Sequence, residues 1–173
     1  MGKSLENQII KKIYGHGRGC AFSTIDFTPL GSRTAIDTCL HRLFKKGTIR
    51  RVIRGIYDYP KYSNLLKQNM SPDIDQVASA LARKFGWYIQ VTGPTALNYL
   101  GLSTQVPGRY IYVTNGPNRK YTIGKQTLEF QNKALKESGF KLRESPIIVQ
   151  ALKSLGEECY RLMGKSQAFN KQP

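Results

Sequence analysis

The stretch 31-GSRTAIDTCLHRLFKKGTIRRVIRGIYDYP-60 decides how the first part of this chain folds. Ser32 is a good helix cap, and apolar residues then recur at helical spacing until Gly47 ends the helix. One side of this helix is apolar and is expected to face a core; it carries Ala35, Ile36, Cys39, Leu40, Leu43 and Phe44. The other side is polar and basic, which predicts an exposed helix.

The residues after Gly47 predict a basic β-hairpin. Residues 48–53 are β-branched and basic, Arg54-Gly55 offers a turn, and 56–59 can return as the partner strand before Pro60 ends it. A basic helix followed directly by a basic hairpin is suited to a polyanion rather than to a catalytic step. The alternative is that both features are ordinary solvated surface, since charge often guards helix faces and edge strands.

Two helices are expected before residue 31. Ser4 can cap the first, whose apolar residues end at the glycine-rich loop 15–19, and Ser23 to Asp26 resembles the capping box of a very short second helix that ends before Pro29. A winged helix-turn-helix has this order of elements: a helix, a short helix, a tight turn, an exposed helix and a hairpin. The expected fold class is therefore α+β, with an N-terminal winged helix-turn-helix followed by a small α+β domain.

The charge of the chain indicates a nucleic-acid partner. Lysine and arginine number 27 against 11 acidic residues, for a net charge of +16 and a pI near 9.9. Both halves share the basic excess. No apolar run approaches the ~18 residues of a membrane-spanning helix, and no signal peptide opens the sequence. We therefore expect a cytoplasmic, nucleoid-associated protein with no membrane partner.

An exposed helix of this kind fits the major groove of duplex DNA, while the hairpin meets phosphates or the minor groove. Asp37, on the same helix, is expected either to repel phosphate or to orient a neighbour. The helix residues predicted to contact DNA are Arg33, Thr34, Thr38, His41 and Arg42. The predicted phosphate or hairpin contacts are Lys45, Lys46, Arg50, Arg51 and Arg54.

A family resemblance adds to this interpretation. Segments 22–61 and 92–116 resemble the winged N-terminal domain and the start of the second domain of AbiEi-type antitoxins, from bacterial type IV toxin–antitoxin and abortive-infection systems. The matching motifs are Phe22, Asp26, Leu30-Gly31, Arg42-Leu43, Lys46-Gly47, Arg51-Val52, Arg54-Gly55-Ile56-Tyr57, Ala96-Leu97, Gly101-Leu102 and Thr104-Gln105-Val106-Pro107.

The resemblance implies an antitoxin that represses its own operon by binding repeats in promoter DNA, as a monomer or weak dimer, and counteracts a nucleotidyltransferase-like toxin. It divides the chain into a DNA-binding domain at 1–60, a linker at 61–72, an α+β antitoxin domain at 73–158 and a tail at 159–173 that fits neither domain.

The second half predicts a small mixed domain. Ser71 is expected to cap a helix with Pro72 in its first turn, followed by a strand at 87–91, a helix at 95–100, strands at 109–114, 120–123 and 127–130, and a late helix at 146–155. A second basic surface is expected among these strands; it would combine Arg109, Arg119, Lys120 and Lys125 with Tyr110, Tyr112 and Tyr121.

Catalysis, metal binding and cofactors are not expected. The three cysteines lie far apart, and neither histidine shares a zinc-ligand spacing with them. The enzyme alternative is a metal-dependent nuclease that would use Asp73 and Glu129, with Gln131 and Lys133 on the same strand. An RNA-binding protein is the other alternative, because net charge does not distinguish ribose from deoxyribose.

Overall fold

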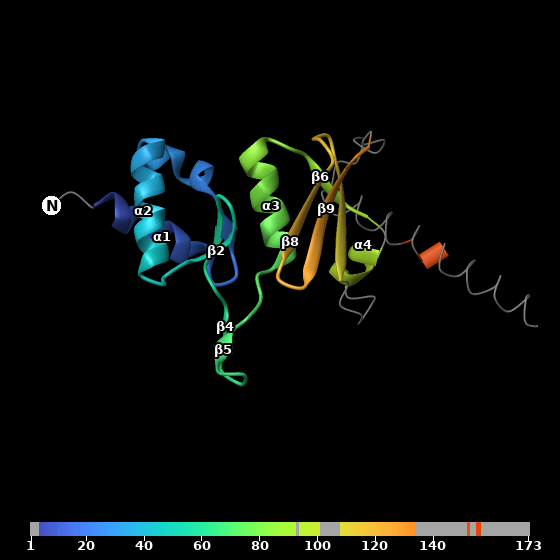
Figure 1. The fold of residues 1–173 in the computed structure, drawn as a ribbon, viewed down its shortest axis with the longest axis horizontal. Helices are drawn as coiled ribbons and strands as arrows, with labels where there is room; N and C mark the ends of the chain where they lie inside the picture. Colours follow the sequence, from blue (N-terminus) through green and yellow to red (C-terminus); the bar gives the residue numbers. More distant parts are fainter. Residues whose placement is uncertain (1–3, 93, 101–107, 134–151, 153–154, 157–173) are drawn as a thin grey trace, which may run out of the picture. The chain divides into compact units, whose positions relative to one another are not determined.

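The computed structural model describes residues 4–92, 94–100, 108–133, 152 and 155–156 (Figure 1). Helices and strands are mixed along the chain, which confirms the α+β fold class. The chain divides into two compact units, one formed by Met1–Tyr88 with Thr122–Lys125 and the other by Ile89–Tyr121 with Gln126–Pro173.

Local capping sets the first helices of unit one. Helix α1 (Leu5–His16) begins at Ser4, whose hydroxyl accepts a hydrogen bond from the backbone N–H of Asn7. The second helix, η1 (Thr24–Leu30), begins with the expected capping box, in which the N–H of Ser23 donates to Asp26 Oδ2 over 2.7 Å. Its geometry is 3₁₀, and it runs through Pro29, where the sequence predicted an earlier end. A 3₁₀ turn accepts the fixed φ of proline.

Helix α2 (Arg33–Lys45) has the expected bounds: Ser32 accepts from the N–H of Ala35, and Gly47 follows with φ 72°. Its apolar side joins α1 and η1 in one core. That core consists of Ile9, Ile13, Phe22, Phe27, Ile36, Cys39, Leu40, Leu43 and Ile49. Burying this side leaves the opposite side of α2 to solvent.

A small antiparallel sheet completes the core of unit one. Strands β2 (Arg50–Ile53) and β3 (Ile56–Asp58) form the expected hairpin, and β1 (Ala21–Phe22) pairs with the outer side of β3, in the order β1-β3-β2. Strand β1 is only two residues long, too short for any periodicity to predict it.

Residues predicted as a linker have structure of their own. Strands β4 (Tyr62–Ser63) and β5 (Gln68–Asn69) make a two-stranded ribbon. The following helix, α3 (Ile74–Phe85), starts at Asp73 rather than at Ser71, because the Asp73 carboxylate accepts from the N–H groups of Asp75 and Gln76. This helix belongs to unit one, so the compact unit extends past the boundary expected at 61–72.

A mixed sheet makes up most of the second unit, and the last two residues of one of its strands, Thr122 and Ile123, are grouped with unit one. Its strands are β6 (Ile89–Val91), β7 (Arg109–Thr114), β8 (Arg119–Ile123) and β9 (Gln126–Asn132), in the order β6-β7-β9-β8, and helix α4 spans Pro94–Tyr99. The last strand lies between β7 and β8 and runs parallel to β7. The strand expected at 87–91 is shorter than predicted, and the late helix expected at 146–155 falls largely outside the described residues.

Candidate nucleic-acid interface

The outward side of α2 is a continuous exposed surface. Its central residues, one turn apart, are Thr34, Thr38, His41 and Lys45, and all are exposed. The Thr38 hydroxyl donates to the backbone oxygen of Thr34 over 2.9 Å, so its oxygen remains available as an acceptor. Arg33 and Arg42 flank the surface and are also exposed. The structure therefore brings the predicted helix contacts together on one face.

Asp37 has a role inside the fold. Its Oδ1 accepts a hydrogen bond from the hydroxyl of Thr24, at the start of η1. This contact fixes the orientation of α2 relative to η1. Of the two expectations for Asp37, the contact favours the orienting one.

Arg50 differs from the other predicted phosphate contacts. Its Nε and Nη2 donate to the two oxygens of Asp58, and its Nη1 donates to the backbone oxygen of Met70 over 3.0 Å. Asp58 is only 2% exposed, and a buried carboxylate needs such a partner. Arg50 is thus committed to the fold, which corrects its assignment as a phosphate contact.

The remaining hairpin cations face solvent. Arg51 and Arg54 are exposed, and neither forms an ion pair within the described part of the chain. Lys46, by contrast, pairs with Glu6 of α1, although its side chain stays 61% exposed. An exposed pair of this kind is weak, so Lys46 can exchange Glu6 for a phosphate.

Sequence reasoning missed Lys84, near the end of α3. Its Nζ lies 3.4 Å from the backbone oxygen of Arg54 in the hairpin turn. Partial burial lowers the pKa of Lys84, and the neighbouring charges of Arg33 and Arg54 lower it further, while Asp37 acts in the opposite direction. The only sequence signal was a Lys in the last turn of a helix, which is common on any protein surface.

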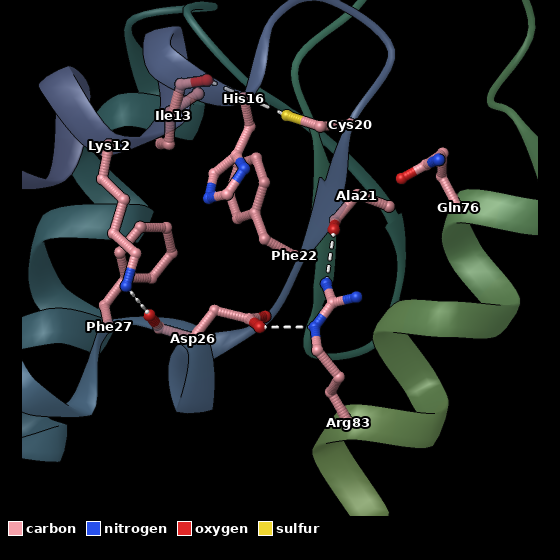
Figure 2. Close-up of a pocket in the computed structure, with 10 residues that line it drawn as sticks. All are labelled: Lys12, Ile13, His16, Cys20, Ala21, Phe22, Asp26, Phe27, Gln76 and Arg83. Atoms are coloured by element: carbon pink, nitrogen blue, oxygen red, sulfur yellow. Dashed lines mark hydrogen bonds and ion pairs between the residues drawn. The ribbon is translucent and has the colours of Figure 1, made fainter. Parts of the chain in front are cut away.

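A pocket of about 360 Å³ lies between α1, β1, η1 and α3 (Figure 2). Its charged groups already serve the fold: Lys12 Nζ donates to the backbone oxygen of Asp26, and Arg83 donates to Asp26 Oδ1 over 2.6 Å and to the backbone oxygen of Ala21 over 3.0 Å. Figure 2 shows Arg83 reaching from α3 to both acceptors. These bonds hold α3 against η1 and β1.

The second predicted basic surface is not assembled as expected. Tyr112 is buried and packs near Phe130, and Tyr121 meets the same ring edge-on. Arg109 pairs with Glu129. The strands do leave Lys120 exposed, and Lys125 is exposed in the β8–β9 turn. Buried tyrosines cannot stack on bases, so the stacking part of that prediction is wrong for Tyr112.

The acids proposed for a nuclease both have structural partners. Asp73 caps α3, while Glu129 accepts from Gln131 and Arg109, and these two bonds, in that order, lower the pKa of Glu129. Within the described ranges, no three histidine, cysteine or acidic side chains are grouped as metal ligands. Burial raises the pKa of the Cys20 thiol, so this cysteine stays protonated near neutral pH.

Comparison with known proteins gives one family. A model for the family of unknown function DUF6088 matches residues 8–167. The chain belongs to this family. A search of curated proteins found no match. The matched residues include parts of both compact units, so the exposed α2 surface and the mixed sheet both lie within the match to the family model. No helix in the described part of this DUF6088 member is long and apolar enough to cross a membrane.

Proposed function

We propose that this DUF6088 member binds duplex DNA sequence-specifically through a winged helix-turn-helix. One observation carries the proposal: α2 buries its apolar side in the core and presents Thr34, Thr38, His41 and Lys45 to solvent, directly before a hairpin that exposes Arg51 and Arg54. In this assignment α1, η1 and α2 are the three helices, and β2–β3 is the wing.

The chemistry of these side chains suits the task. Hydroxyl and imidazole groups can donate to or accept from base edges in the major groove, which is wide enough for an α-helix. Guanidinium groups on the wing can bind phosphates, which supply affinity and fix the register without reading sequence. The division of labour is therefore base contacts from Thr34, Thr38 and His41, and phosphate contacts from Arg33, Arg42, Arg51 and Arg54.

The biological role that we propose rests on the sequence resemblance to AbiEi-type antitoxins alone. In this proposal the protein represses its own operon by binding promoter repeats and counteracts a nucleotidyltransferase-like toxin. Autorepression needs only the α2 surface and the wing. No surface is assigned to the toxin.

The test is binding to the DNA immediately upstream of the gene and to a scrambled duplex of equal length, each at two salt concentrations. We expect a preference of roughly 10³-fold or more for the upstream duplex that survives the higher salt. Equal, salt-sensitive binding to both duplexes would contradict specific readout.

Two additions to the same assay separate the alternatives. A structured RNA that displaced the upstream duplex at equal concentration would favour the RNA-binding function. Mg²⁺-dependent nicking that disappears in Asp73→Ala would favour the nuclease; we expect no nicking, because Asp73 caps α3.

A further inference from the structure

Lys84 of α3 lies against the turn of the β2–β3 hairpin. Its Nζ is 3.4 Å from the backbone oxygen of Arg54 and only 2.5 Å from the position that a Cβ on Gly55 would occupy. Gly55 has φ 77°, so glycine both allows this turn and leaves room for the ammonium group. The Lys84 ammonium group therefore lies beside the backbone of Arg54, in the turn of the hairpin.

The N-terminus of α2 is tied to the same region through η1. Thr24 of η1 donates to Asp37, one turn beyond Arg33, and Asp26 of η1 binds Arg83, the neighbour of Lys84. The charges of Arg33 and Arg54 both act on the Lys84 ammonium. The geometry therefore places the Lys84 ammonium at the Arg54-Gly55 turn, and the bonds of η1 tie the first turns of α2 and the end of α3 to the same part of unit one.

A bound anion would stabilise this arrangement. Like charges at a partly desolvated site repel one another. None of Arg33, Arg54 and Lys84 forms an ion pair within the described ranges, whereas Lys46, Arg50, Arg83 and Arg109 all do. The Asp37 carboxylate, which accepts a hydrogen bond from the neutral Thr24 hydroxyl, keeps its negative charge and offsets part of this repulsion. The first backbone N–H groups of α2 add further positive potential beside Arg33.

We propose that Lys84, Arg33 and Arg54 form one phosphate-binding site, which brings α3 into the nucleic-acid interface as a third contacting element. The ligand is a phosphodiester of the DNA backbone. A phosphate there would contact the N-terminal end of α2, the wing and α3 together, and so fix how α2 enters the groove. This inference rests on the proposed DNA-binding function.

The test removes the positive charge of Lys84 and keeps a side chain of similar length. In the full chain, Lys84→Met should weaken binding to the upstream and scrambled duplexes alike and reduce the slope of log affinity against log salt by about one. Lys84→Arg should keep the wild-type slope. Lys11→Met, at an exposed position of α1, is the matched control and should change nothing. Thermal unfolding of each variant shows that the fold is kept.

A second measurement does not depend on DNA. Titration of the wild-type protein with inorganic phosphate, followed by NMR of lysine and arginine side chains, should shift the signals of Lys84, Arg33 and Arg54 before that of Lys11. If the protein binds DNA but Lys84→Met keeps the wild-type slope, the site is wrong. If the protein binds no DNA while phosphate still shifts these three signals, the proposed function fails and the anion site stands.

Discussion

Two surfaces of the molecule, the outward side of α2 with the β2–β3 turn and the mixed sheet, use their arginines differently. On α2 and the β2–β3 hairpin, Arg33, Arg51 and Arg54 are exposed and have no acidic partner within the described residues. On the mixed sheet, Arg109 pairs with Glu129, and the nearby Tyr112 is buried. Both parts of the sequence are basic. The difference teaches that net charge indicates a polyanion partner, whereas the pairing of individual cations locates the surface that meets it.

The largest expected effect concerns a cation that belongs to the fold. Arg50→Ala leaves the buried Asp58 carboxylate without its partner, so we expect the free energy of unfolding to fall by about 3–5 kcal/mol. Denaturant unfolding measures this. Arg51→Ala, at the exposed adjacent position, should change it by less than about 0.5 kcal/mol. Equal effects of the two substitutions would show that Arg50 and Arg51 have the same role.

The next effect tests base readout on α2. His41→Ala should weaken binding to the upstream duplex by about 1–3 kcal/mol and relax selectivity at one base position, because the exposed imidazole that we propose to contact a base edge is lost. Affinities measured for single-base variants of the duplex check this. Binding to the scrambled duplex is the control and should stay unchanged. A uniform loss on every duplex would reassign His41 to the phosphate backbone.

A smaller effect compares the two units directly. Arg51→Ala should weaken all duplexes alike and lower the salt slope by about one, whereas Lys120→Ala on β8 should leave both quantities unchanged. Salt titrations of the two variants decide the matter. An equal loss in Lys120→Ala would extend the nucleic-acid surface to the mixed sheet. No change in Arg51→Ala would mean that the hairpin is not a wing.

The smallest effect is the pH dependence of the mixed sheet. Hydrogen bonds from Gln131 and then Arg109 lower the pKa of Glu129 from 4.5, so its ionised form stabilises the fold. That stabilisation is complete above the unfolded pKa and is lost as the pH falls through the lower folded pKa. NMR titration of the Glu129 carboxyl carbon measures this pKa, which Arg109→Ala should raise toward the ordinary value. An unchanged pKa would remove Arg109 as a cause.

The sequence by itself determined the elements whose signals lie within a few residues. Ser4 and Ser32 cap α1 and α2, Gly47 ends α2, and the apolar spacing of α2 separates its core side from its exposed side. The hairpin at 50–58 followed from β-branched residues around Arg54-Gly55. Capping and periodicity are local, so they can be read along the chain before any folding is known.

The tertiary structure decided everything that depends on a distant partner. Asp58 accepts hydrogen bonds from Arg50 on the neighbouring strand, and Asp26 of η1 accepts one from Arg83, which is 57 residues away in sequence. Lys84 meets the turn at Arg54 from a helix 30 residues further along the chain, and the bonds of Arg83 help to hold that helix against η1 and β1. Strand β9 lies between β7 and β8, an order that depends on pairing between strands distant in sequence and that no local pattern encodes. Residue types show which charges exist, but only the folded backbone decides which of them neutralise one another.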